Sequence, residues 1–159
     1  MNLSRSGFVA SAALAAVGAA TAIPKVAAAA GQTLEATMYG SHLGIKGPDG
    51  KPHDVMIPTN FVVKAGVPFT MTVTNYDEGP HTITAPEMGL NAQIKPGNEV
   101  SKDNIVPVKT TFTFTAQKKG VYRWYCALPC DEGHGAWDMQ TGYGGPDKEG
   151  FMAGYFVVQ

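Results

Sequence analysis

Two segments of the chain alternate regularly between apolar and polar residues. In residues 33–38 the apolar positions are Leu34, Ala36 and Met38, and threonine and glutamate lie between them. In residues 69–74 phenylalanine, methionine and valine alternate with threonine. A period of two residues places the apolar side chains on one face of an extended strand, and β-branched residues such as threonine favour strands. Both segments are therefore predicted to be half-buried β-strands.

Further short runs have the apolar and β-branched composition of strands, and glycine and proline separate them. They are residues 55–57, 61–64, 82–84, 111–115, 121–126 and 154–158. After Gly31 no stretch of ordinary helix length shows a helical period. The glycine- and proline-rich residues 40–53 and 141–150 are predicted to be loops. Seven or eight strands without helices predict an all-β sandwich or barrel.

The first thirty residues differ from the rest of the chain. Arg5 precedes an apolar run over residues 7–23, and residues 27–30 are alanines suited to cleavage before Gly31. Residues 4–9 resemble a twin-arginine signal that lacks its second arginine. We predict an export signal over residues 1–30, with an uncleaved membrane anchor as the alternative, and one domain over residues 31–159. The protein is then expected in the periplasm or on the outer face of the cytoplasmic membrane.

The charge of the predicted mature domain is mildly acidic. Removal of residues 1–30 takes away Arg5 and Lys25, so the formal net charge changes from −1 to −3. No arginine-rich run or basic stripe is present, which excludes the usual nucleic-acid-binding surfaces. The sequence also lacks a nucleophile elbow, a phosphate loop and a dinucleotide fingerprint, so it identifies no small-molecule substrate.

The only two cysteines of the chain and one of its four histidines lie within nine residues, as Cys126, Cys130 and His134. Two thiolates and an imidazole favour copper, zinc or an iron–sulfur cluster over calcium or magnesium. Structural zinc sites need four ligands and commonly pair cysteines two residues apart, whereas three residues separate these two. The spacing therefore favours copper. A disulfide between Cys126 and Cys130 is the alternative in an exported protein.

A second candidate ligand, His81, follows a strand-like run and a polar turn, residues 75–80. In a Greek-key sandwich such a histidine can lie beside the loop that contains the cysteines. Here the sequence resembles the cupredoxins, in residues 62–66, 69–81 and 119–126. Within that superfamily it is most similar to the binuclear copper (CuA) domain of cytochrome oxidase subunit II and nitrous oxide reductase. The resemblance spans roughly residues 60–159 and implies a Greek-key β-sandwich.

Three features carry the similarity to the CuA domain. The spacing Cys126-x3-Cys130-x3-His134 is that of the family, residues 81–97 resemble its stretch from the first ligand histidine to a Pro-Gly turn, and residues 151–158 resemble its final strand. The resemblance implies that both thiolates bridge two copper ions. His81 would bind one ion and His134 the other, and the backbone carbonyl of Leu128 would be a weak ligand.

The methionine ligand of the family has no counterpart at its usual position. It lies three residues after the histidine, where this chain has Trp137. Met152 has the family's Met-x-Gly context and is predicted to take its place, with residues 135–150 as an inserted loop. Met139 is the alternative, although any methionine can also simply fill a gap in a core.

The resemblance implies a protein that transfers single electrons and is not itself an enzyme, although it could be a subunit or partner of an oxidase or reductase. Three alternatives remain open at this point. The first is a mononuclear blue or red copper protein that uses His81, one cysteine, His134 and a methionine. The second is a copper-binding or delivery protein without redox activity. The third is a structural sandwich with a Cys126–Cys130 disulfide.

Four carboxylates flank the two predicted histidine ligands, namely Asp77, Glu78, Asp131 and Glu132. They are interpreted as an acidic rim for a cationic redox partner, such as a basic cytochrome, or for a membrane oxidase or reductase. The alternative is that they are ordinary solvated turn residues. His42 and His53 lie in the predicted early loop and are expected to be solvated.

Overall fold

The structure, a computed structural model, describes residues 31–43, 46, 50–128, 130 and 151–159. Two short 3₁₀ turns and a series of β-strands make up its regular elements. They are β1 (Gln32–Tyr39), η1 (Ser41–Leu43), β2 (Val55–Ile57), β3 (Phe61–Val63), β4 (Phe69–Tyr76), β5 (His81–Ala85), η2 (Pro86–Met88), β6 (Leu90–Ile94), β7 (Asn98–Ser101), β8 (Asn104–Val106), β9 (Val108–Phe114), β10 (Gly120–Tyr125) and β11 (Ala153–Val158).

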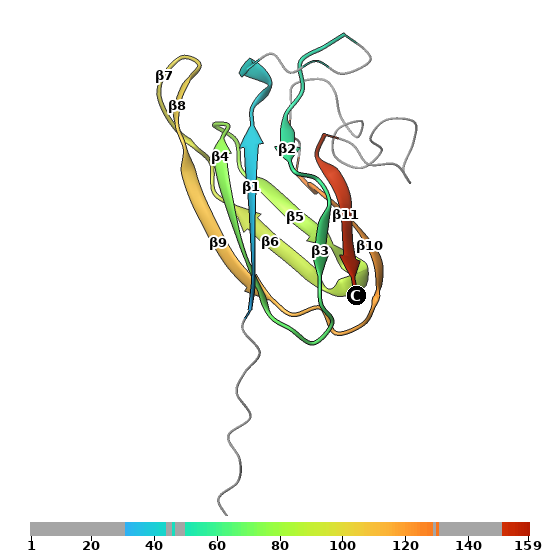
Figure 1. The fold of residues 1–159 in the computed structure, drawn as a ribbon. Helices are drawn as coiled ribbons and strands as arrows, with labels where there is room; N and C mark the ends of the chain where they lie inside the picture. The colour runs from blue at the N-terminus through green and yellow to red at the C-terminus, as the bar shows by residue number, and fades with distance from the viewer. Residues whose placement is uncertain (1–30, 44–45, 47–49, 129, 131–150) are drawn as a thin grey trace, which may run out of the picture.

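The strands form two sheets that pack face to face, together with a projecting hairpin (Figure 1). One sheet has the order β2-β1-β4-β9 and the other the order β3-β11-β10-β5-β6, while β7 and β8 form the hairpin. The pairs β1–β4 and β3–β11 are parallel, whereas the other pairs are antiparallel. This confirms the prediction of an all-β sandwich.

The core lies between the two sheets and is built from the alternating positions that the sequence pattern identified. Met71 and Val73 of β4 are fully buried, and Phe69 stacks on Phe156 of the opposite sheet with a centroid distance of 5.7 Å. Trp124 of β10 is also fully buried, and its indole Nε1 donates to the carbonyl of Thr59 at 2.7 Å. Burial of these aromatic and other apolar side chains away from water therefore stabilises the packing of the two sheets.

All eight predicted strands are present, with ends that differ by a few residues. Three further strands, β6, β7 and β8, were not predicted. β6 buries Leu90, Ala92 and Ile94, but the polar residues Asn91 and Gln93 lie between them, and asparagine is depleted in strands. β7 is exposed along its whole length, so no burial pattern marks it. Pairing with a neighbouring strand, rather than local composition, makes these segments extended.

The early loop is more ordered than predicted. It contains η1 and an isolated bridge between Lys46 and Pro52. His53, expected to be solvated, is fully buried and packs against Phe151 with a centroid distance of 5.5 Å. The His42 side chain is 13% exposed and lies 3.9 Å from Glu78. Both expectations of a solvated histidine were wrong, because contacts with distant segments cover this loop. The second predicted loop, residues 141–150, lies outside the described residues.

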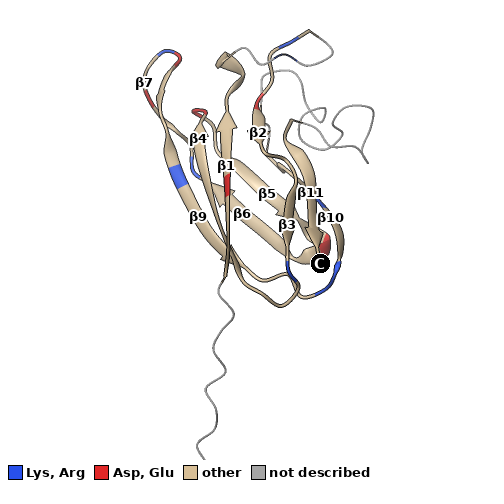
Figure 2. Cartoon of the chain, in the orientation of Figure 1, with Lys and Arg blue, Asp and Glu red and all other residues tan. Residues whose placement is uncertain are grey.

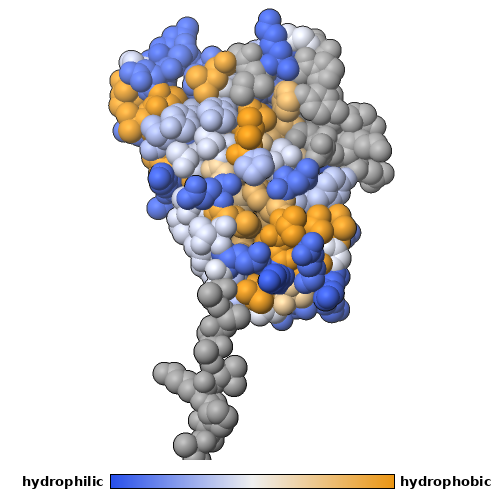
Figure 3. All heavy atoms as spheres, in the orientation of Figure 1, coloured by the Kyte–Doolittle hydropathy of each residue, from blue (hydrophilic) through white to orange (hydrophobic). Residues whose placement is uncertain are grey.

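Charged residues gather mainly in turns and near strand ends (Figure 2). On the face seen in Figure 3, apolar patches alternate with polar ones, and the hairpin carries two exposed valines, Val100 and Val106. Among the described residues no helix has the length and apolar character needed to cross a membrane. The predicted export signal, residues 1–30, lies outside the described residues.

Candidate metal centre

His81 begins β5 directly after a turn that is fixed by the side chain of Asn75. The Asn75 amide donates to the carbonyls of Gly79 and Lys95, both at 3.0 Å, and its oxygen accepts the N–H of Asp77 at 2.8 Å. An Asn side chain that bonds the backbone two residues ahead is a common way to stabilise such a turn. These bonds direct His81 into the protein, where it is 1% exposed.

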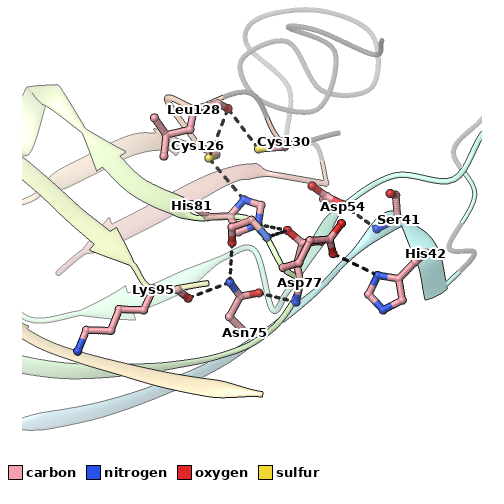
Figure 4. Close-up of polar contacts among 12 residues, drawn as sticks. Ser41, His42, Asp54, Asn75, Asp77, His81, Lys95, Cys126, Leu128 and Cys130 are labelled. Carbon is pink, nitrogen blue, oxygen red and sulfur yellow. Dashed lines mark hydrogen bonds and ion pairs between the residues drawn. The ribbon is translucent and has the colours of Figure 1, made fainter. Parts of the chain in front are cut away.

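A buried carboxylate holds the ring of His81 (Figure 4). The Nε2 atom of His81 lies 2.8 Å from Oδ2 of Asp77, and the Gly79 N–H donates to the same oxygen at 2.8 Å. Because an ionised carboxylate can only accept, Nε2 carries a proton in this arrangement. A carboxylate behind a histidine in this way fixes the tautomer and leaves the other nitrogen for a metal. That atom, Nδ1, lies 3.9 Å from the sulfur of Cys126.

Cys126 follows the last residue of β10 and is fully buried. Its N–H donates to the carbonyl of Met152 at 2.9 Å, and its sulfur accepts the backbone N–H of Thr82 at 3.3 Å. The Thr82 hydroxyl accepts the N–H of Ala127 at 2.8 Å. The sulfur is therefore held between β5 and the segment that leads into β11.

Cys130 follows β10 in the chain and lies at the same place as Cys126. The carbonyl oxygen of Leu128 lies 3.7 Å from the sulfur of Cys126 and 3.4 Å from that of Cys130 (Figure 4). One ring nitrogen of His81 and the two sulfurs all lie within 4.8 Å of one another. Both cysteines belong to the described part of the chain, and the structure does not join them in a disulfide. Four of the predicted donors thus converge.

The remaining predicted ligands are placed less completely. Met152 immediately precedes β11, is fully buried, and lies next to Cys126 through its backbone carbonyl. His134 and the alternative Met139 lie outside the described residues, as do Trp137, Asp131 and Glu132. The structure therefore describes a donor set of one imidazole, two thiols and one carbonyl.

Hydrogen bonds within the site shift the pKa values of its side chains in the copper-free protein. The hydrogen bond with Cys130 lowers the pKa of the Cys126 thiol, whereas burial raises it. Hydrogen bonds with His81 and the Thr82 amide lower it further, so that the pKa falls to about 4. Burial alone would lower the pKa of His81, but the hydrogen bonds with Asp77 and Cys126 outweigh it and raise the pKa to about 9. Burial likewise opposes ionisation of Asp77, and its bond with His81 keeps its pKa below the ordinary value. At neutral pH the copper-free site is thus a buried row of alternating charges.

Asp77 corrects one prediction from the sequence. It was assigned to an exposed acidic rim, but it is only 5% exposed, whereas the side chain of its neighbour Glu78 is 57% exposed. The bond with His81 explains the difference, because a buried charge needs a partner. Sequence reasoning missed this supporting role of Asp77, and also that of Thr82. A carboxylate in a polar turn four residues before a ligand histidine was the available signal.

A polar cleft of about 710 Å³ opens beside the donors. It is lined by Asp54, Asp77, Glu78, Lys102, Asp103 and Cys130, among others. His81 and Cys126 do not line it. One thiol therefore faces the cleft while the other lies behind it in the core.

Comparisons with solved structures find cupredoxin folds at low sequence identity. A purple cupredoxin from Nitrosopumilus maritimus is 17% identical over 79% of this chain and 99% of its own, with a TM-score of 0.42. The periplasmic domain of subunit II of cytochrome oxidase (CoxB) of Bradyrhizobium japonicum is 18% identical over 80% of this chain and 83% of its own, with a TM-score of 0.43. Auracyanin from Roseiflexus castenholzii is 21% identical over 82% and 98%, with a TM-score of 0.44.

Comparison with curated protein sequences finds no match. The family model for the cupredoxin-like domain, in contrast, matches residues 10–136, which include β1 to β10 and both cysteines. That family implies copper, and the nitrogen and sulfur donors that meet at the ends of β5 and β10 are of the borderline to soft kind that copper prefers. The sandwich fold and the match together show that this chain belongs to the cupredoxin-like domain family.

Proposed function

We propose that this protein is an exported electron carrier that uses a binuclear, CuA-like copper centre. The observation that carries the proposal is the convergence of two thiols on one buried imidazole, with the Leu128 carbonyl in contact with both sulfurs. Cys126, Cys130 and His81 would hold copper together with His134. Copper supplies a one-electron couple when it is bound. The protein is proposed to act as a carrier rather than as an enzyme, for a redox partner or a membrane oxidase or reductase.

The surrounding residues suit electron transfer because they are fixed in advance. Asp77 orients His81, and Thr82 and Met152 hold Cys126 through their backbones. Trp124 is buried in the same core cluster as Cys126. Donors that cannot rearrange keep the geometry similar in both oxidation states, which favours rapid electron transfer. Burial of His81 and Cys126 also disfavours the delivery alternative, which requires exchangeable ligands.

A mononuclear centre is the second candidate, and one observation favours it. Cys126 is fully buried and receives the Thr82 N–H, whereas Cys130 is partly exposed and lines the cleft. The two thiols are therefore not equivalent, and a site built on His81 and Cys126 alone, with His134 and a methionine, would satisfy this asymmetry.

Copper content and electron paramagnetic resonance of the loaded protein distinguish the two centres. The binuclear centre predicts about two coppers per chain and one unpaired electron shared by two copper nuclei. Cys130→Ser should abolish the shared signal and leave a one-thiolate site. A stable coloured form with one copper and hyperfine splitting from a single nucleus would instead establish the mononuclear centre, and a protein that takes up no copper would refute both.

The methionine ligand can be assigned by substitution. Met152→Leu preserves volume, so it should shift the reduction potential and absorption spectrum modestly while changing stability by less than about 1.5 kcal/mol. Met139→Leu should leave the reduction potential and the absorption spectrum unchanged. The reverse pattern would move the ligand to Met139 and show that residues 135–150 are not an insertion.

A further inference from the structure

We propose that His42, Asp77 and Glu78 form a second metal site, apart from the two thiols, for a divalent ion of the zinc type. One ligand atom of each side chain lies within 4.8 Å of those of the other two. Zinc is bound by imidazole and carboxylate groups, and three protein ligands leave a fourth position for water or another small ligand. All three residues line the polar cleft, so the fourth position opens to solvent.

The backbone around η1 holds His42 beside these carboxylates. The N–H of Ser41 donates to Oδ1 of Asp54 at 2.7 Å, which ties the 3₁₀ turn to the start of β2. Gly40, just before the turn, leaves room for the ligand atoms. A Cβ at Gly40 would overlap Oδ1 of Asp77 and would lie 2.6 Å from Nδ1 of His42. The carboxylate oxygen and the imidazole nitrogen therefore lie next to the same small space.

The spacing and the charge of the three side chains suit a shared cation better than a direct contact. Nδ1 of His42 lies 3.9 Å from Oε2 of Glu78, which is too far for a hydrogen bond. Two atoms that bind one zinc ion at about 2.1 Å lie about 3.4 Å apart in tetrahedral geometry, so a small movement of Glu78 closes the site. Asp77 is only 5% exposed and lies beside a second carboxylate. A divalent ion between the two carboxylates relieves their repulsion.

Asp77 connects this second site to the thiol site through its two oxygens. Oδ2 accepts the Gly79 N–H and lies 2.8 Å from Nε2 of His81, whereas Oδ1 lies beside His42. Figure 4 shows Asp77 between the two histidines. A cation on Oδ1 draws electron density from the carboxylate, weakens its bond with His81 and makes that imidazole a poorer donor. This consequence rests on the proposed copper centre, whose reduction potential should rise when the second ion binds.

Zinc binding is tested first in the full-length, copper-free protein with Cys126→Ser and Cys130→Ser, because the thiols would otherwise compete for zinc. Calorimetric titration of this background with Zn²⁺ should show binding. His42→Ala and Glu78→Gln, each added to the background, should weaken zinc binding by about tenfold or more, because each removes a ligand. Asp103→Asn is the matched control, since Asp103 lines the same cleft and has the same charge but is not one of the three ligands. It should leave the zinc affinity near that of the background.

Three results of the titration would overturn the second site. The first is a background that binds no zinc, and the second is an equal affinity in the background and in Glu78→Gln. The third is an equal loss in Glu78→Gln and Asp103→Asn, which would mean that the charge of the cleft attracts zinc without specific ligands. The Glu78 side chain is 57% exposed, so its variant gives an answer even if His42→Ala does not fold.

The link to the thiol site is tested in the copper-loaded wild-type protein. Addition of Zn²⁺ should raise the reduction potential of the copper centre, and this rise should be absent in His42→Ala. Zinc that binds without changing the potential would overturn the link through Asp77. If the wild-type protein took up no copper, the proposed function would fail, and the zinc titration would still decide the second site.

Discussion

At the scale of single residues, the candidate site depends on a carboxylate that bonds the imidazole of His81 on the side away from the two thiols. Asp77 is buried behind His81 and receives Nε2–H and the Gly79 N–H on one oxygen. A buried carboxylate without such partners would be strongly unfavourable. The two hydrogen bonds explain why this charge is tolerated, and they make the orientation of His81 depend on it.

Neutralising Asp77 should weaken the metal site without removing a ligand. Asp77→Asn keeps the shape of the side chain but loses the charge that favours the Nε2 proton, so copper affinity should fall by about tenfold or more. Competition with a chelator measures the change. Glu78→Gln, which neutralises the exposed neighbouring carboxylate, is the control and should leave affinity near wild type. Equal affinities for both variants would mean that Asp77 only shapes the turn.

Cys126 should make the stability of the copper-free protein depend on pH. Its pKa is about 4 when folded and 9.0 in the ordinary state, so its contribution is fully present above 9.0 and is lost as pH falls toward 4. His81, raised from 6.5 to about 9, contributes fully below 6.5 and loses this contribution as pH rises through about 9. Between pH 4 and 6.5 only the contribution of Cys126 to stability changes with pH. Above 6.5 the contribution of Cys126 still rises while that of His81 falls.

The expected result is a difference in unfolding free energy between wild type and Cys126→Ser that grows as pH rises from about 4, because the bond between His81 and Asp77 is present in both proteins and its pH dependence largely cancels. Urea unfolding of both proteins, copper-free and under reducing conditions, measures it. A difference that is constant with pH would show that the folded thiol is not ionised.

At the scale of elements, the placement of β11 decides where the Met152 carbonyl meets Cys126. Gly154 pairs with Trp124, and its Cα approaches the backbone of Thr59 so closely that a Cβ would overlap the Thr59 carbonyl. The same carbonyl accepts the indole N–H of Trp124 at 2.7 Å. Glycine is therefore required here by space, and not by an unusual backbone conformation.

Gly154→Ala should force β11 away from the segment that contains Thr59. Overpacking of this kind costs about 1–3 kcal/mol, and urea unfolding measures the loss. Val121→Ala, at a position that is 63% exposed on β10, is the control and should cost much less. Wild-type stability in Gly154→Ala would show that the Thr59 segment can move aside freely.

At the scale of the whole molecule, the surface beside the metal site has both signs of charge. Glu78, Lys102 and Asp103 line the cleft together with Cys130, and Asp77 contributes from within. Electrostatic attraction at such a surface acts mainly on the rate of encounter with a partner and is screened by salt. Of the four carboxylates of the predicted acidic rim, Glu78 is exposed and Asp77 is buried, whereas Asp131 and Glu132 lie outside the described residues.

Replacement of Glu78, Asp131 and Glu132 by their amides should slow association with a basic cytochrome by about tenfold at low ionic strength. The difference should shrink as salt is added, while transfer within the formed complex stays constant because no ligand has changed. The control replaces Glu35, Glu87 and Glu99 by glutamine, which removes the same charge from positions that do not line the cleft. Stopped-flow kinetics at several salt concentrations measure the association rates. Equal association rates for the two triple variants would show that the acidic rim does not attract the cytochrome.

The sequence by itself determined the strands that have one buried face and the proximity of the two cysteines. Alternation along β4 and the spacing of Cys126 and Cys130 are local properties, which do not depend on what packs nearby. The position of His81 beside them could be expected only through the resemblance to a known fold, because 45 residues separate it from Cys126.

Only the tertiary structure decided which polar residues are buried. It placed Asp77 and His53 in the interior, and it brought the Thr82 hydroxyl to 2.8 Å from the backbone nitrogen of Ala127. It also paired β7 with β8, which have no buried face of their own. The physical reason is the same in each case. Burial and strand pairing depend on which distant segments come into contact, and the residue types of a segment do not specify its neighbours.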